Sequence, residues 1–169
     1  NGRIKPWMSM ISQLPLILVI LAPFFLLLPT GAGAADDDFA NLEVLVEAIR
    51  NHTGEVAVAL FENKKGFPTH IEHSYEPVWF PLKELPEGAE TIHHIFEGLP
   101  AGDYAVSIFH DENGNRKLDR YTFGFPKEGV GFSNDQKVKL SAPNFDDCKL
   151  ILSEGENRKI VIKLDYQDS

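Results

Sequence analysis

The sequence lacks several features that would point to common protein classes. It has a single cysteine, Cys148, so no disulfide can form within the chain. It has no surplus of basic residues, and its formal net charge of −9 argues against binding nucleic acid or anionic lipid. It shows no phosphate-binding loop, dinucleotide fingerprint or nucleophile elbow. The sequence therefore predicts a protein without catalytic residues, in which Cys148, beside an apolar run, is a buried and inert thiol.

The N-terminal segment has the pattern of a secretory signal peptide. Arg3 and Lys5 precede an uncharged stretch in which residues 14–28 are all apolar, followed by small residues at 31–35. This pattern predicts a signal peptide over residues 1–34, with cleavage after Ala34. The alternative is an uncleaved membrane anchor. It is the weaker reading, because two prolines interrupt the run and a spanning helix needs ~20 apolar residues.

The remainder, residues 35–169, is predicted to form one domain. It holds all 25 acidic residues and 14 of the 16 Lys and Arg residues, which gives a formal charge of −11. Such a charge favours solubility in an exported compartment. We therefore expect a periplasmic or extracellular protein that binds no nucleic acid and is not stably inserted in a membrane after signal cleavage.

Short segments rich in β-branched residues recur along this domain, separated by turn residues, and no long helical pattern is present. This pattern predicts an all-β sandwich of about seven strands. Residues 55–61 are apolar on both faces and are predicted to form a central strand. The proline-rich stretch 62–88 allows only edge strands, and the glycine-rich stretch 126–134 is predicted to be a loop. The predicted strands are 41–50, 55–61, 91–96, 104–110, 121–125, 149–152 and 158–164, with brief pairing at 137–140.

A tyrosine corner is predicted where residues 102–104 read Gly-Asp-Tyr at the start of a strand. In Greek-key sandwiches such a tyrosine hydrogen-bonds back to nearby backbone. Tyr104 therefore favours a Greek-key β-sandwich.

The segment 111–119 carries the clearest chemical pattern. Its side-chain oxygens fall at positions 1, 3, 5 and 9 of the loop, which matches the first nine positions of an EF-hand-like calcium loop. A carbonyl at position 7 would add a further ligand, and Leu118 at position 8 would anchor the loop to the core. The predicted calcium ligands are Asp111, Asn113, Asn115, Lys117 through its carbonyl, and Asp119.

Two positions depart from the calcium-loop pattern. Position 6 is Arg116 instead of glycine, and position 12 is Thr122 instead of a bidentate glutamate. A carboxylate from elsewhere would have to complete the site, and the candidates are Glu128, Asp135 and Asp103. The alternative without a metal is a hairpin, because Asn-Gly at 113–114 is the favoured type I′ turn pair.

The histidines and aromatic residues give weaker signals. His70 and His73 could hold a transition metal, although a lone His-x-x-His pair is unspecific. His93 and His94 are adjacent, so on a strand they should point to opposite faces. His110 is expected at the edge of the core. An aromatic platform for a sugar or protein could form from Tyr75, Trp79 and Phe80, although aromatic residues near prolines more often fill a core edge.

Residues 99–149 carry several motifs that resemble one protein family. These are Gly-Asp-Tyr-Ala-Val, His-Asp-Glu-Asn-Gly-Asn with Leu-Asp, Gly-Phe-Pro-Lys-Glu-Gly, Gly-Phe-Ser-Asn and Ala-Pro-Asn-Phe-Asp-Asp-Cys-Lys. In combination they resemble a secreted bacterial family of the domain of unknown function 2141 type. The resemblance implies a bacterial, exported protein with a prealbumin-like sandwich, similar to transthyretin and carboxypeptidase regulatory domains. It implies no activity and no catalytic residues.

These observations favour a non-enzymatic binding or accessory module whose partner is an unidentified protein or carbohydrate of the cell envelope. The calcium pattern adds the expectation of a calcium-stabilised loop. The first alternative is a structural, envelope-associated protein with no small ligand. The second is a hydrolase, which would need a pocket that combines His110 with carboxylates. Apart from Ca²⁺, no cofactor is expected.

Overall fold

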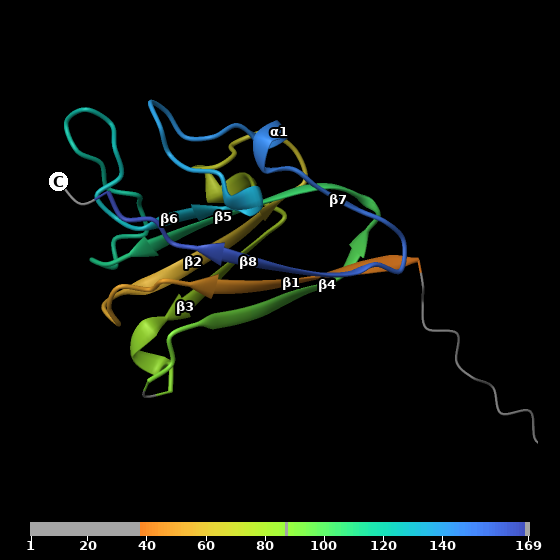
Figure 1. The fold of residues 1–169 in the computed structure, drawn as a ribbon, viewed down its shortest axis with the longest axis horizontal. Helices are drawn as coiled ribbons and strands as arrows, with labels where there is room; N and C mark the ends of the chain where they lie inside the picture. The colour runs from red at the N-terminus through yellow and green to blue at the C-terminus, as the bar shows by residue number, and fades with distance from the viewer. Residues whose placement is uncertain (1–37, 87, 168–169) are drawn as a thin grey trace, which may run out of the picture. The chain divides into compact units, whose positions relative to one another are not determined.

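The computed structural model describes residues 38–86 and 88–167 (Figure 1). The predicted signal peptide, residues 1–34, lies outside the described residues. Among the residues that are described, no helix has the length and apolar character needed to cross a membrane.

The described part of the chain forms eight strands in two sheets. The first sheet has the order β4 (Ile92–Pro100), β1 (Phe39–Glu47) and β8 (Asn157–Lys163), and its β1–β8 pair is parallel. The second sheet has the order β3 (Glu76–Pro81), β2 (Glu55–Phe61), β5 (Gly102–Asp111) and β6 (Val130–Phe132), with β7 (Leu150–Leu152) paired to β5. Short helices lie in the connections: η1 (Ile71–His73), η2 (Leu82–Glu84), η3 (Ser133–Asp135) and α1 (Phe145–Cys148). The predicted all-β class is confirmed, while the Greek-key and prealbumin-like topologies remain predictions.

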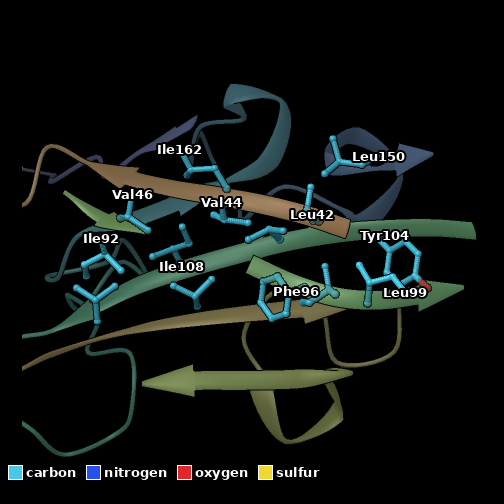
Figure 2. Close-up of a cluster of buried hydrophobic side chains, with 14 of the residues drawn as sticks. Leu42, Val44, Val46, Ile92, Phe96, Leu99, Tyr104, Ile108, Leu150 and Ile162 are labelled. Atoms are coloured by element: carbon cyan, nitrogen blue, oxygen red, sulfur yellow. The ribbon is translucent and has the colours of Figure 1, made fainter. Parts of the chain in front are cut away.

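The main core lies between the two sheets and follows from alternation along the strands. In β1 the side chains of Leu42, Val44 and Val46 are completely buried, while the residues between them are partly exposed. Figure 2 shows these three side chains packed with Phe96 of β4 and Ile108 of β5. Each buried aliphatic or aromatic side chain of this kind contributes roughly 1.5–3 kcal/mol to folding.

A second apolar cluster covers the other face of the five-stranded sheet. Ala57, Ala59 and Phe61 of β2 contribute to it, as does Phe109 of β5. The connecting loops supply its outer side through Phe67, Leu118, Val138 and Phe145. Because β2 is buried on both faces and lies between β3 and β5, its predicted central position is confirmed.

The predicted tyrosine corner is confirmed. The Tyr104 hydroxyl, at the start of β5, donates a hydrogen bond to the Pro100 carbonyl over 2.9 Å. The ring itself is buried in the main core, so one residue joins the β4–β5 turn to the packing between the sheets.

Several predicted strand boundaries are wrong. The first strand ends at Glu47, because Ala48 adopts a left-handed conformation with φ 62° and is exposed. Residues 121–125 form turns closed by one isolated bridge between Arg120 and Pro126, and no strand forms at 137–140.

The predicted loop at 126–134 contains β6. Its residues are buried and pair with Ser107–Phe109 of β5. Gly131 is required there, because a Cβ atom at this position would lie 2.7 Å from Ile162 Cγ2. The glycine thus permits close packing of a strand, and is not a sign of a loop.

Candidate functional site

The segment 111–119 begins where β5 ends, and its first residue is fixed in the structure. Asp111 is completely buried and its backbone pairs with Glu55 of β2. Gly54 allows this close approach, because a Cβ atom there would lie 1.9 Å from the Asp111 carbonyl oxygen. The loop therefore starts from a rigid point at one end of the five-stranded sheet.

The Asp111 carboxylate organises the loop. Its Oδ1 accepts the backbone N–H groups of Gly114 (2.9 Å) and Asn115 (3.2 Å), and its Oδ2 accepts that of Arg116 (2.6 Å). These bonds draw the chain into a tight curl around one buried carboxylate. A carboxylate offers about four lone-pair sites, so one remains on Asp111 for another partner.

The loop makes the sharp turn at position 6 without glycine. Arg116 takes the left-handed conformation with φ 58°. Its guanidinium pairs with Glu55 (Nε–Oε1 2.9 Å) and lies 4.8 Å from the centre of the Trp79 ring. These contacts offset the ~1–2 kcal/mol cost of that backbone conformation for a residue with a Cβ atom.

The type I′ hairpin alternative is wrong. A type I′ turn needs positive φ at both central residues. Gly114 has φ 71°, but Asn113 is not among the described residues with positive φ. The curl around Asp111 takes the place of that hairpin.

Asp119 closes the loop from its far end. Its Oδ2 accepts the side-chain amides of Asn113 (2.6 Å) and Asn115 (3.4 Å). The structure thus brings together the four predicted side-chain ligands: Asp111, Asn113, Asn115 and Asp119. Lys117 lies in the same curl, and its N–H donates to Asn115 Oδ1 over 2.7 Å.

Of the three distant carboxylates considered from the sequence, Glu128 is the one that reaches the loop. It is 3% exposed and accepts the backbone N–H groups of Glu112 (3.1 Å) and Asp119 (2.9 Å). Burial raises the pKa of Glu128, as do the nearby negative charges of Asp111 and Asp119, although its two hydrogen bonds oppose the rise. Asp103 instead pairs with Lys149. The Glu128 carboxylate therefore lies close enough to Asp111 and Asp119 to feel their charges, although among the described residues no three such side chains are arranged as a metal site.

A polar network beside the loop was missed by sequence reasoning. Arg50 forms an ion pair with Glu112 and lies over the ring of Tyr166, 4.4 Å from its centre. Hydrogen bonds from Arg50 are the main reason that the pKa of Glu112 lies below its ordinary value. His110 is completely buried, deeper than predicted, and hydrogen-bonds the Tyr166 hydroxyl (2.9 Å) and the Thr53 carbonyl (2.7 Å). No sequence motif links these distant residues.

The structure does not assemble the predicted aromatic platform. Trp79 and Phe80 are neighbours on β3, so they point to opposite faces of the sheet. Trp79 packs on Phe109, whereas Phe80 packs on the main core and contacts His94. Tyr75 is exposed before the strand begins.

Three other histidines contact residues outside the loop at 111–119. His93 contacts Glu43 (3.0 Å) while His94 packs against Phe96, which confirms that they face opposite sides. His70 contacts Glu72 (3.1 Å). Among the described residues, no group of three or more His, Cys, Asp or Glu side chains is arranged as a metal site. Cys148 is buried as predicted, and burial raises the pKa of its thiol to about 12.

Comparison with known protein families agrees with the motifs around this loop. A family described as an uncharacterised protein conserved in bacteria, DUF2141, matches residues 44–160. The chain belongs to this family. The match covers the whole five-stranded sheet, β4, parts of β1 and β8, the loop at 111–119 and Glu128. No curated protein and no solved structure matches the chain.

Proposed function

We propose that this DUF2141 protein is an exported, non-enzymatic accessory or binding module whose loop at 111–119 binds Ca²⁺. The observation that carries the proposal is the curl around Asp111. In this curl Asp111 accepts three backbone N–H groups and Asp119 accepts the side-chain amides of Asn113 and Asn115, and the four residues have the sequence spacing that calcium loops use.

The residues fit a hard cation. Calcium takes six to eight oxygen ligands at ~2.3–2.6 Å, from carboxylates, amide and backbone carbonyls and water. Asp111 and Asp119 supply charge, and Asn113 and Asn115 supply amide oxygens. The two amide nitrogens donate to Asp119, and the two amide oxygens accept the backbone N–H groups of Asn115 and Lys117. An ion bound by these oxygens would therefore replace those backbone bonds.

Bound calcium would also relieve the electrostatic stress in the site. Burial is the main reason that the pKa of Glu128 is raised, and the nearby charges of Asp111 and Asp119 raise it further. A cation among these carboxylates would lower the cost of keeping all three ionised. With few charged ligands, we expect a dissociation constant of about 10⁻⁴–10⁻³ M, the range of extracellular calcium modules.

The test is thermal unfolding of the protein in millimolar calcium and in chelator. A ligand that binds only the folded state raises its stability by mass action. Asp119→Asn removes one charge without removing an acceptor from any backbone N–H, so it should abolish the calcium-induced rise and barely change stability in chelator. Asp103→Asn is the matched control, because it removes an equivalent charge away from the loop. An equal calcium-induced rise in wild type and Asp119→Asn would refute the site.

A further inference from the structure

A groove with a basic side lies next to the loop that curls around Asp111. The groove is lined by residues 69–72 of one segment, by Arg116, Lys117, Leu118 and Arg120 of another, and by Phe109 of β5. The groove has a volume of about 480 Å³. Small-molecule sites typically measure ~300–1,000 Å³, so the groove is large enough for a ligand.

The charge on one side of this groove is opposite to that of the whole chain. Arg116, Lys117 and Arg120 line it, although the chain has a net charge of −9. Lys117 and Arg120 are exposed, and among the described residues neither has a carboxylate within ion-pair distance. Glu72 also lines the groove, with its carboxylate 3.1 Å from His70 Nδ1, and adds one negative charge to it. The groove therefore offers two cations to an anionic group.

The groove also has an apolar part. Phe109 and Leu118 line it, and both belong to the second apolar cluster. They also line an adjoining cavity of about 20 Å³, whose other walls include Val130, Phe132 and Val138. That cavity has room for roughly one water molecule, so a bulkier group would rest on Phe109 and Leu118 in the groove.

We propose that this groove binds an amphipathic anion, namely an acyl or alkyl chain with a phosphate or carboxylate head. The head would lie against Lys117 and Arg120, where charge-assisted hydrogen bonds can form. The chain would pack on Leu118, which is half-buried, and on Phe109, which is 8% exposed, and would remove their remaining apolar surface from water. The inference deepens the proposed role as a binding module, and it does not depend on calcium binding.

Two exposed apolar side chains bear on the source of such a ligand. Phe123 is 90% exposed and Leu140 is 98% exposed. They lie on the two loops that flank the small cavity, and in Figure 1 these loops, coloured teal and blue, rise on the same side of the sheet. The same chemistry could thus come from a free amphiphile or from the surface of an anionic bilayer. The negative net charge opposes the second source, but the cations near these loops favour it locally.

The first experiment is isothermal titration of the full chain, in chelator, with dodecyl phosphate below its micelle concentration. We expect saturable binding that the double variant Lys117→Glu/Arg120→Glu weakens by about tenfold or more, since two charge-assisted contacts are lost. Lys64→Glu/Lys65→Glu is the matched control. It makes the same charge change in an exposed turn outside the groove and should leave the affinity within about twofold.

Further arms separate the head from the chain and the free amphiphile from the bilayer. Inorganic phosphate should bind about tenfold more weakly than dodecyl phosphate, because it leaves Phe109 and Leu118 uncovered. The wild type is tested by sedimentation with phosphatidylglycerol vesicles, beside the double variant Phe123→Ser/Leu140→Ser. If the variant no longer sediments with the vesicles but still binds monomeric dodecyl phosphate, the ligand belongs to a bilayer. Monomer binding without sedimentation would assign it to a free amphiphile.

Three results would overturn the inference. These are no saturable binding of dodecyl phosphate, equal weakening by both charge-reversal variants, or equal binding of inorganic phosphate. Calcium binding is scored by a separate titration on the same protein. A protein that binds calcium but not dodecyl phosphate would therefore contradict this inference alone.

Discussion

The Asp111 carboxylate gives the sharpest prediction about stability. Asp111→Asn keeps one oxygen, which can still accept the N–H groups of Gly114 and Asn115. In the structure the Arg116 N–H donates to Asp111 Oδ2 over 2.6 Å. The substitution replaces this oxygen with an amide nitrogen, so two N–H donors would face each other. Asp111→Ala removes all three hydrogen bonds and leaves a void at a completely buried position.

The magnitudes follow from what each variant leaves unpaired. A hydrogen bond to a charged group contributes ~1.5–3 kcal/mol, and about 1 kcal/mol where water can replace the lost partner. Residues 114–116 are exposed, so water can reach their backbone once the loop opens. We therefore expect a loss of about 1.5 kcal/mol in the free energy of unfolding for Asp111→Asn, and about 3 kcal/mol for Asp111→Ala.

The assay is urea unfolding followed by circular dichroism, in chelator so that calcium does not contribute. Asp103→Asn is the control, since its exposed ion pair with Lys149 should contribute only about 0–1 kcal/mol. If Asp111→Ala lies within about 0.5 kcal/mol of that control, the carboxylate does not organise the loop and the reasoning fails.

Three further predictions concern single side chains. Tyr104→Phe removes the bond to the Pro100 carbonyl and should cost about 1 kcal/mol in urea unfolding, while an unchanged midpoint would contradict the tyrosine corner. Cys148, with a pKa of about 12, should resist iodoacetamide at about pH 8 until urea is added. Arg50 holds the pKa of Glu112 below its ordinary value of 4.5, so their interaction stabilises the fold above that pH and is lost as pH falls through the lowered value. Glu112→Gln should therefore reduce stability at neutral pH and flatten its acid dependence, and parallel pH profiles for the two proteins would exclude this contribution.

Strands with several β-branched residues could be predicted from the sequence, and segments held by distant partners could not. β1, β2, β5 and β8 carry enough β-branched residues to reveal their buried faces. β6 is three residues long with Gly131 at its centre, so its composition indicates a loop. It forms a strand because β5 offers backbone partners on one side and Ile162 requires a residue without a Cβ atom.

The candidate site likewise has a part that could be predicted from local sequence and a part that depends on distant residues. The spacing of oxygen-bearing side chains located the loop, because ligands that share one short segment are visible in sequence. Glu128 could be named only as one of three candidates, since its choice depends on the path of the chain after Asp119. The network of Arg50, His110 and Tyr166 joins segments more than 50 residues apart, and no local pattern records it.

The central claim is that the loop around Asp111 binds calcium, and titration calorimetry of the full chain with Ca²⁺ tests it most directly. We predict one ion per chain, with a dissociation constant of about 10⁻⁴–10⁻³ M, lost in Asp119→Asn and retained in Asp103→Asn. Absence of binding at several millimolar calcium, or the same binding in Asp119→Asn as in wild type, would contradict the claim.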